Sequence, residues 1–558
     1  MKVVDVFRRG SATTPAWTSQ GVAAQQSQGG SEAMLSAMIQ AGTAPDLRLP
    51  DFSKFRGNLT DFYGPSGYGL AWVKEGRATL QAQAAIDALQ QAEGRGLNAE
   101  DYDGPRWAQR LQMLQRSVPQ PSPAELAGFD LALTVALMRY VSDVHLGRVN
   151  PRFFHAGFNI GPAKYDLARF LRQQLVDAQD VNAVLATTEP PFPSYRLDRE
   201  ALVTYLRLAR EDSGEELPVP ATPVLRGGMY PGVERLARLL RLLGDLPPDA
   251  VVPEGETVYS STLEEAVKRF QGRHGLDMDG QLGRPTLEQL NAPLQRRVRQ
   301  LQLALERWRW VPHEFSHPPI IVNIPEFQLR AWDEANRVAL SMKVIVGEAY
   351  RNETPVFAKD MRYITFRPYW HVPLNIQRRE LVPKILNDRD YLAKNGYEVT
   401  DNRGTVVSTG AVSDETLEGL RRGLALVRQK PGPLNSLGPV VFKFPNEFDV
   451  YLHGTPAPTL FFRSRRDFSH GCIRVEYPEK LAVWALHEEP GWDEPRILSA
   501  MRGSKTIQVN LDHPIPVLVL YTTAMVVDDG TVKFLQDIYG HDAAMEQVLA
   551  KGFPYPGQ

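Results

Sequence analysis

The sequence predicts a multidomain α+β protein in which a mostly α-helical N-terminal scaffold precedes a β-rich C-terminal domain. Two observations support this fold class. A chain of 558 residues is too long for one hydrophobic core, so three or four folded units are expected. Apolar residues recur at helical intervals up to residue 309 and then fall into short runs typical of strands.

Composition and charge narrow the class of function. Apolar residues make up 43% and charged residues 23% of the chain, which is ordinary for folded proteins. A net charge of −2 gives no broad basic field, which argues against nucleic acid as a partner. No stretch approaches the roughly 20 apolar residues of a membrane span, and residues 1–30 lack an apolar core of signal-peptide length. We expect a soluble protein that is either cytosolic or lacks its native leader.

The N-terminal part divides into a leader and a helical domain. Residues 1–45 are rich in Gln, Ser, Gly and Ala without periodic apolar spacing, which predicts a flexible leader. Residues 46–223 are predicted to form a helical scaffold domain, with the clearest helical spacing at 126–141. A proline-rich linker at 217–223 ends this domain.

Residues 224–295 are predicted to form a small three-helix domain. Amphipathic spacing places helices at 233–244 and 263–276, and a glycine-rich turn at 277–283 precedes a third helix. The pattern AVxxFQxxxGL followed by DGxxGxxT resembles the peptidoglycan-binding three-helix domain. The resemblance implies that the turn contacts glycan or stem peptide. A generic helical bundle with a tight turn is the alternative.

Residues 296–540 are predicted to form the β-rich domain, which begins with a helix at 296–309. A charged stretch at 374–433 interrupts the strands, and we expect an inserted helical capping subdomain that covers the active site. The alternative is a solvated surface excursion. Residues 541–558 are expected to form a C-terminal tail. Strands are predicted at 319–324, 328–332, 340–347, 361–366, 440–444, 450–453, 506–511 and 517–523, with a helix at 478–487.

The one cysteine, Cys472, lies in Ser-His-Gly-Cys-Ile-Arg and follows His453 by nineteen residues. A lone thiol cannot form an intramolecular disulfide, and it is often only a small buried hydrophobe. Here an imidazole lies close in sequence, and a thiol nucleophile needs such a base because it is only slightly ionised near neutral pH. This arrangement favours Cys472 as nucleophile and His453 as general base.

The residues around Cys472 supply the other requirements of acyl transfer. The tight turn from Ser469 through His470 and Gly471 can aim backbone N–H groups at an oxyanion. A backbone carbonyl in the turn at Gly454 can orient the other ring nitrogen of His453. His470 is either a second electrostatic partner or a structural histidine, and we favour the structural role. The guanidinium of Arg474 suits a carboxylate, either of the substrate or of the protein.

These motifs resemble the L,D-transpeptidase catalytic domain of the YkuD type, in which an HGT element precedes SHGC. The order of domains resembles that of the large Gram-negative members, which carry a scaffold and a peptidoglycan-binding domain. Arg474 stands where many members of the wider family have Asn, so its role in substrate binding is argued from its own chemistry. The resemblance also directs attention to Tyr451 and Asn435 as substrate-binding residues, because both lie in matching segments.

The resemblance implies a specific reaction. The thiol attacks the bond between diaminopimelate and the terminal D-alanine of a tetrapeptide stem and forms a thioester. An amine of a second stem then gives a 3→3 cross-link, whereas water gives carboxypeptidase activity and a free D-amino acid gives exchange. The resemblance implies no cofactor or metal, periplasmic localisation, peptidoglycan stem peptides and glycan as partners, and carbapenems as acylating agents. It leaves room for partners among other cell-wall synthesis proteins.

Two other readings compete with this one. His453, His470 and Cys472 are all ligand types for zinc, but no paired-histidine or paired-cysteine spacing supports a metal site. The second reading is a noncatalytic cell-wall-binding scaffold with an inert thiol. A scaffold has no need of thiol, imidazole and glycine turn together, so we expect an enzyme.

Overall fold

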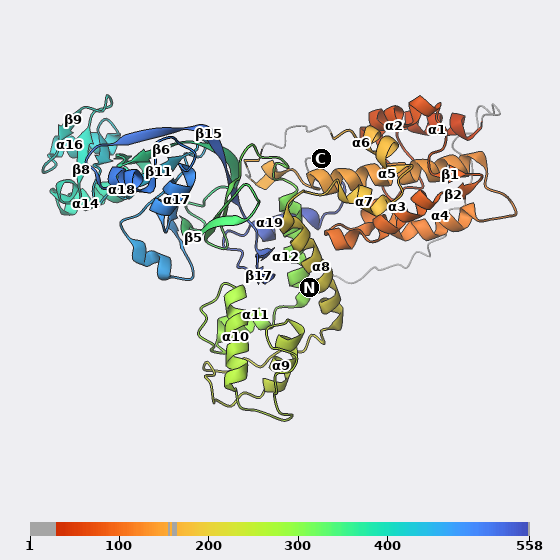
Figure 1. Ribbon diagram of the computed structural model, residues 1–558, viewed down its shortest axis with the longest axis horizontal. Coiled ribbons are helices and arrows are strands. Elements are labelled where there is room, and N and C mark those ends of the chain that lie inside the picture. Colours follow the sequence, from red (N-terminus) through yellow and green to blue (C-terminus); the bar gives the residue numbers. More distant parts are fainter. Residues whose placement is uncertain (1–29, 155–156, 159–164, 556–558) are drawn as a thin grey trace, which may run out of the picture. The chain divides into compact units, whose positions relative to one another are not determined.

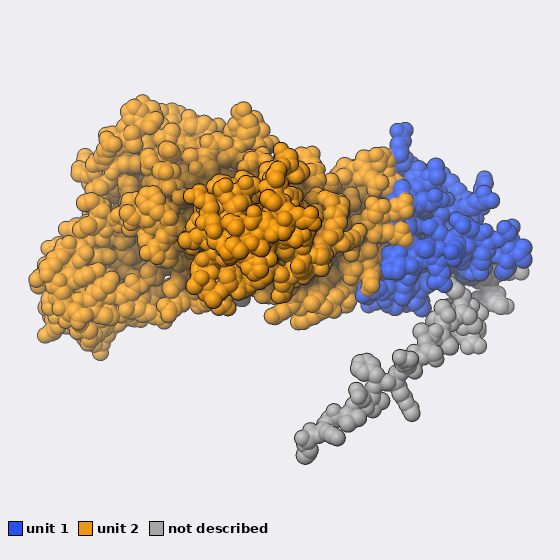
Figure 2. Space-filling model, turned by 90° about the horizontal axis from the view of Figure 1, so that it is seen from below, with its two compact units in different colours: residues 1–86, 103–138, 166–179 blue, residues 87–102, 139–165, 180–558 orange. Residues whose placement is uncertain are grey.

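The computed structural model describes residues 30–154, 157–158 and 165–555. The chain forms two compact units, coloured separately in Figure 2. Unit 1 comprises residues 1–86, 103–138 and 166–179, and unit 2 comprises residues 87–102, 139–165 and 180–558. Helices dominate the N-terminal region and a large sheet dominates the C-terminal region, so the predicted α+β multidomain class is confirmed.

Unit 1 is helical, and a buried polar cluster lies in its core. The Asp130 carboxylate accepts hydrogen bonds from the Tyr63 hydroxyl and from the Trp72 amide, each at 2.7 Å. Thr134 accepts from the Trp72 indole at 2.9 Å. The first described helix, at Ser31–Ala41, falls in the segment expected to be a flexible leader; residues 1–29 of that leader lie outside the described residues. The elements with residues in this unit are α1 (Ser31–Ala41), α2 (Arg56–Tyr63), β1 (Val73–Lys74), β2 (Arg77–Ala78), α3 (Leu80–Gln90), α4 (Trp107–Leu114), α5 (Pro123–Leu146) and α6 (Leu167–Phe170).

Unit 2 contains the long helices α8 and α12, which run side by side in Figure 1. Helix α12 carries Glu306, whose fully buried carboxylate accepts from Arg148 Nε at 3.1 Å and from Arg309 Nη1 at 3.0 Å. A charge without solvent must be paired in this way to be tolerated. The helices before the sheet are α7 (Val181–Ala186), α8 (Pro193–Glu211), α9 (Val233–Leu242), α10 (Ser261–Arg273), α11 (Arg284–Leu290) and α12 (Leu294–Trp308).

Helices α9, α10 and α11 form the group at the bottom of Figure 1 and enclose a hydrophobic core of their own. The glycine-rich turn predicted from the sequence is held from inside by Gln271. Its Oε1 accepts from the Gly280 amide at 2.8 Å, and its Nε2 donates to Asp279 at 2.8 Å. One buried glutamine therefore fixes the turn that follows α10.

The large sheet of unit 2 has nine strands in the order β13-β5-β14-β12-β11-β6-β15-β3-β4. Strand β4 also pairs with β5, so eight of the strands close into a barrel. One long strand, β15, occupies the place of two predicted ones and contains an irregularity between Asn510 and Ile515. The strands are β3 (Ile320–Asn323), β4 (Gln328–Trp332), β5 (Val338–Gly347), β6 (Phe357–Phe366), β11 (Val440–Lys443), β12 (Leu452–His453), β13 (Asp467–Ser469), β14 (Ile473–Val475) and β15 (Ile507–Leu520).

The insertion at 374–433 folds around its own core and is mixed rather than only helical. Its strands form a four-stranded sheet in the order β7-β10-β8-β9, to which β7 (Trp370–His371) contributes from just before the insertion. The apolar side chains between helices and sheet are fully or largely buried, among them Ile385 and Leu420. The remaining elements are α13 (Leu374–Ile376), the π-helical turn η8 (Gln377–Leu381), α14 (Val382–Asn387), α15 (Tyr391–Lys394), β8 (Tyr397–Thr400), β9 (Val406–Ser408), α16 (Asp414–Arg422) and β10 (Leu426–Gln429).

Residues 541–555, which belong to the predicted C-terminal tail, contain a packed helix. Helix α19 (His541–Leu549) buries Met545, and the Tyr555 hydroxyl donates to Asp101 at 2.6 Å. The other elements after the motif are α17 (Pro478–Ala485), α18 (Glu494–Arg502), β16 (Ala524–Val526) and β17 (Val532–Phe534). Across the described part of the chain, the helices fall short of the length and apolar character that crossing a bilayer requires.

Candidate active site

Strand register brings the predicted catalytic residues onto one face of the barrel sheet. Strands β12 and β14 are parallel, with Leu452 opposite Ile473 and His453 opposite Arg474. Side chains alternate along a strand, so Leu452 and Ile473 share the opposite face, where both are completely buried. Cys472 directly precedes Ile473 and therefore lies on the same face as His453. Two motifs nineteen residues apart thus meet because their strands are neighbours.

Cys472 lies at the end of a tight turn that Ser469 stabilises. The Ser469 hydroxyl donates to the Cys472 carbonyl at 2.5 Å and accepts from the Gly471 amide at 3.1 Å. Gly471 has a φ of 111°, a backbone conformation that residues with a Cβ rarely adopt. Since the Gly471 N–H is already bonded to Ser469, the Cys472 N–H is the stronger candidate donor to an oxyanion.

His453 is buried and its ring is fixed by a backbone carbonyl. Nδ1 lies 2.6 Å from the Gly454 carbonyl oxygen, which is the kind of orienting contact expected from the sequence. Burial, together with Arg474, lowers the pKa of His453 to about 3, although the carbonyls of Gly454 and Leu437 oppose this shift. With Nδ1 carrying the proton, Nε2 has the free electron pair of a base.

The surroundings of the thiol include three residues that sequence reasoning did not assign to its activation. Burial raises the pKa of Cys472, while the Tyr451 backbone and hydroxyl and the Lys443 charge act in the opposite direction. Lys443 lies 3.4 Å from the Tyr451 ring centroid and 3.9 Å from the Asp449 carboxylate. The Cys472 sulfur lies 3.7 Å from the Asp449 carbonyl. Within the described residues, no hydrogen bond joins Cys472 to His453 in this state.

Lys443 could be placed next to Tyr451 from the sequence only if the register between β11 and β12 were known. In the antiparallel pair β11 and β12, Val441 lies opposite His453, so the register places Lys443 opposite Tyr451. Both residues lie two positions along their strands and therefore on the same face of the sheet as His453. Burial lowers the pKa of Lys443, and its Asp449 and Cys472 neighbours oppose that shift. The site therefore combines a thiol, an imidazole, a phenol and an ammonium group.

Arg474 and Asn435 differ in whether their side-chain polar groups are free to bind a substrate. The buried Nε of Arg474 has no hydrogen-bond partner among the described residues, and no carboxylate of those residues influences its pKa. Burial lowers the pKa of Arg474. Asn435 is buried, and its amide donates to the Pro368 and Lys430 carbonyls at 3.1 and 3.0 Å. A substrate-binding role for Asn435 stays a prediction that these contacts do not support.

His470 connects the nucleophile turn to the insertion. Its Nε2 lies 2.5 Å from Glu380 Oε1, and Glu380 belongs to η8 at the start of the insertion. The imidazole remains 42% exposed, and the structural role that we favoured from the sequence stays a prediction. The insertion therefore touches the turn that carries Cys472, as expected for a subdomain next to the active site.

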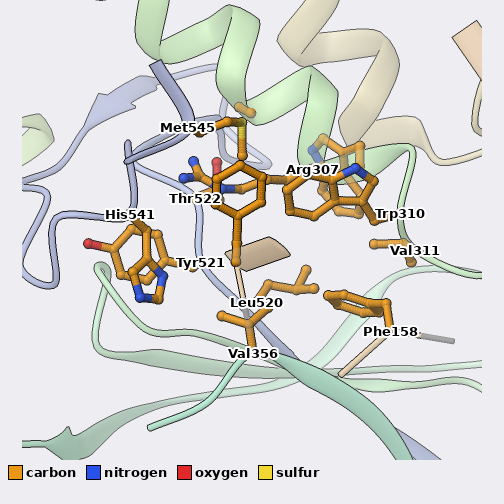
Figure 3. Close-up of a pocket in the computed structure, with 13 residues that line it drawn as sticks. Phe158, Arg307, Trp310, Val311, Val356, Leu520, Tyr521, Thr522, His541 and Met545 are labelled. Atoms are coloured by element: carbon orange, nitrogen blue, oxygen red, sulfur yellow. The ribbon is translucent and has the colours of Figure 1, made fainter. Parts of the chain in front are cut away.

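Two further features of the molecule concern metal binding and a ligand pocket apart from the thiol. Among the described residues, His, Cys, Asp and Glu side chains form no group of three or more that could hold a metal ion. An apolar pocket elsewhere in unit 2 is lined by Trp310, Leu520 and Met545, with Tyr521 and His541 at its wall (Figure 3). No residue predicted for the active site contributes to that pocket.

Three segments of the chain match known sequence families. Residues 318–508 match the YkuD family, described as "L,D-transpeptidase catalytic domain". Residues 230–290 match the family described as "Putative peptidoglycan binding domain", and residues 57–202 match the "Scaffold domain" family. The three matches follow one another along the chain as scaffold, peptidoglycan-binding domain and L,D-transpeptidase catalytic domain, in the order that the motifs predicted.

One relative carries a matching name. A Haemophilus influenzae protein named "Putative L,D-transpeptidase" is 33% identical over 245 residues. The aligned region covers 44% of this chain and 48% of that protein, so this chain matches about half the length of its relative.

Proposed function

We propose that this protein is a cysteine-dependent L,D-transpeptidase that acts on peptidoglycan tetrapeptide stems. The observation that carries the proposal is the shared face of β12 and β14, on which Cys472, His453 and Arg474 meet in a YkuD-type domain. The neighbouring peptidoglycan-binding domain supports peptidoglycan as the polymer to which the enzyme is held. A periplasmic location, a role in cell shape and reaction with carbapenems belong to the same proposal.

The acylation step uses the thiol and the imidazole together. Cys472 Sγ attacks the carbonyl carbon between diaminopimelate and the terminal D-alanine, and the thiol proton passes to His453 Nε2. The C–N bond then breaks, and the same proton passes to the leaving amine of D-alanine. The product is a thioester between Cys472 and the shortened stem. The side-chain amine of a second stem attacks this thioester and forms the 3→3 cross-link, releasing the free thiol.

The resting state is a neutral thiol beside a neutral imidazole. The pKa of Cys472 is raised by burial and that of His453 is lowered to about 3, so a thiolate–imidazolium pair is disfavoured before substrate binds. Proton transfer therefore accompanies formation of the C–S bond. The Tyr451 hydroxyl and the Lys443 ammonium stabilise negative charge on sulfur as it develops.

Arg474 is proposed to bind the carboxylate of the donor stem. Its guanidinium has no carboxylate partner among the described residues, and a substrate anion would supply the missing charge. A guanidinium two residues after the nucleophile, in the strand that begins directly after Cys472, can hold the terminal D-alanine carboxylate close to the scissile bond.

The test is incubation of the purified full chain with defined disaccharide-tetrapeptides, followed by mass spectrometry. We expect release of D-alanine and formation of 3→3-linked dimers, with both lost in Cys472→Ala and reduced about 100-fold or more in His453→Ala. Cys472→Ala should still sediment with purified sacculi. Tripeptide monomers without dimers would indicate a carboxypeptidase instead, and undiminished products from Cys472→Ala would refute the cysteine mechanism.

A further inference from the structure

The peptide unit between Gly471 and Cys472 is held through its carbonyl oxygen. The Gly471 carbonyl accepts a hydrogen bond from Thr354 Oγ1 at 2.8 Å, and Thr354 is completely buried. The Gly471–Cys472 bond is trans, so its carbonyl and its N–H point in opposite directions. A bond that fixes the carbonyl therefore also fixes the direction of the Cys472 N–H.

Thr354 is itself fixed by a second buried residue. Its Oγ1 accepts from the Gly347 amide at 2.8 Å. The Tyr539 hydroxyl donates to the Gly347 carbonyl at 2.6 Å and accepts from the Thr354 amide at 3.3 Å. Tyr539 is 5% exposed. Gly347, Thr354 and Tyr539 form a closed set of hydrogen bonds, which Thr354 joins to the nucleophile turn.

Tyr539 is held in turn by the segment at the end of the chain. Its amide donates to the Tyr521 hydroxyl at 2.9 Å, and that hydroxyl donates to Asp537 at 2.5 Å. Tyr521 is the ring at the wall of the pocket in Figure 3. The match to the catalytic family ends at residue 508, so Tyr521 and Tyr539 lie beyond the part of the domain that the family describes.

We propose that Thr354 and Tyr539 are positioning residues that aim the Cys472 N–H at the oxyanion of the acylation step. This inference rests on the proposed function, because it assigns the oxyanion donor of that reaction. Three observations support it together: the Gly471 N–H is already bonded to Ser469, the Cys472 N–H has no acceptor among the described residues, and the Gly471 carbonyl is anchored by Thr354.

The test compares two reactions at the same sulfur. Acylation by the tetrapeptide donor, or by an activated aryl ester, develops an oxyanion, whereas alkylation by iodoacetamide does not. In Thr354→Val we expect acylation to fall about 10- to 100-fold, less than the 10²–10³-fold loss when an oxyanion donor is removed outright. KM and the alkylation rate should stay within twofold of wild type. Thr354→Ser, which keeps the hydroxyl, should restore most of the acylation rate.

A matched control and a second variant complete the experiment. Thr506 also donates its hydroxyl to a backbone carbonyl of the same domain, that of Arg367 at 2.6 Å, so Thr506→Val should leave both reactions unchanged. If Thr354→Val does not fold, Tyr539→Phe serves in its place, with acylation reduced severalfold and alkylation unchanged. Unchanged acylation in the folded variants, or an equal loss of both reactions, overturns the inference. Absence of D-alanine release by the wild type refutes the proposed function alone, because ester acylation still reports on the turn.

Discussion

The pH dependence of acylation tests the proposed resting state directly. An imidazole with the ordinary pKa of about 6.5 is roughly three-quarters protonated at pH 6. His453 has a pKa lowered to about 3, so at pH 6 only about one ring in a thousand carries the second proton. If His453 is the general base, as proposed, the base is fully available over the whole pH range in which the protein would be assayed.

The raised pKa of the Cys472 thiol gives the second half of this prediction. When His453 takes the proton during attack, the reactive form is thiol plus neutral imidazole, and acylation should change less than about twofold between pH 5.5 and pH 8. Alkylation by iodoacetamide requires preformed thiolate, so its rate should rise about tenfold per pH unit over the same range. His453→Ala should remove the plateau and give acylation the slope of alkylation.

Both rates can be followed in one set of stopped samples by mass spectrometry of the intact protein. The adducts of Cys472 with donor and with iodoacetamide differ in mass, and Cys472→Ala supplies the blank. An acylation rate that falls about tenfold per unit on acidification below pH 6.5 would show that His453 titrates normally. That result would refute the lowered pKa of His453, on which the availability of the base below pH 6.5 depends.

Three further predictions concern single contacts. Replacing the buried carboxylate in Glu306→Gln should lower the free energy of unfolding by about 3–5 kcal/mol, because two buried arginines lose their countercharge; chemical denaturation measures this, and a loss below 1 kcal/mol contradicts it. Burial raises the pKa of Glu306, but its arginine partners hold that pKa below the ordinary value. The stabilisation that the Glu306 carboxylate gives should therefore be complete above the carboxyl pKa of the unfolded chain and be lost as the pH falls. Glu306→Gln should not show this loss. Arg474→Lys should raise KM severalfold for a tetrapeptide with a free carboxylate and hardly at all for its C-terminal amide; equal changes for both would exclude carboxylate binding. Glu380→Gln should speed limited proteolysis of the insertion while changing unfolding by less than about 0.5 kcal/mol, as expected for an exposed pair with His470; an unchanged digestion pattern would argue against that contact as an anchor.

Local patterns in the sequence predicted the elements well, because each depends on residues close together in the chain. The helices α9 and α10 follow from amphipathic spacing, and β3 and β5 follow from runs of β-branched residues. The insertion was harder to predict. Its strands β8 and β10 are only four residues long and carry charged or polar side chains, so a helical subdomain appeared sufficient.

The residues of the candidate site likewise fall into those that local motifs identify and those that only the fold brings together. Cys472 and His453 could be selected from the sequence because their chemistry is rare and their motifs are short. Lys443 could not be assigned, because its place beside Tyr451 depends on the register of β11 against β12. Thr354 acts through a hydrogen bond to Gly471, a residue more than a hundred positions away. Contacts of that kind follow from the closed sheet and leave no local pattern in the sequence.

The closed barrel also constrains how the protein can be made. Strand β15 separates β3 from β6 in the sheet, yet both of its neighbours are synthesised long before it. Until Ile507–Leu520 leaves the ribosome, β3 and β6 each present an unpaired edge that can pair with another chain. Closure through contacts this distant in sequence is slow, because the entropy of a long loop must be lost first. We therefore expect the helical domains to fold during translation and the catalytic domain to complete its fold last, with holdase chaperones protecting the open sheet until then.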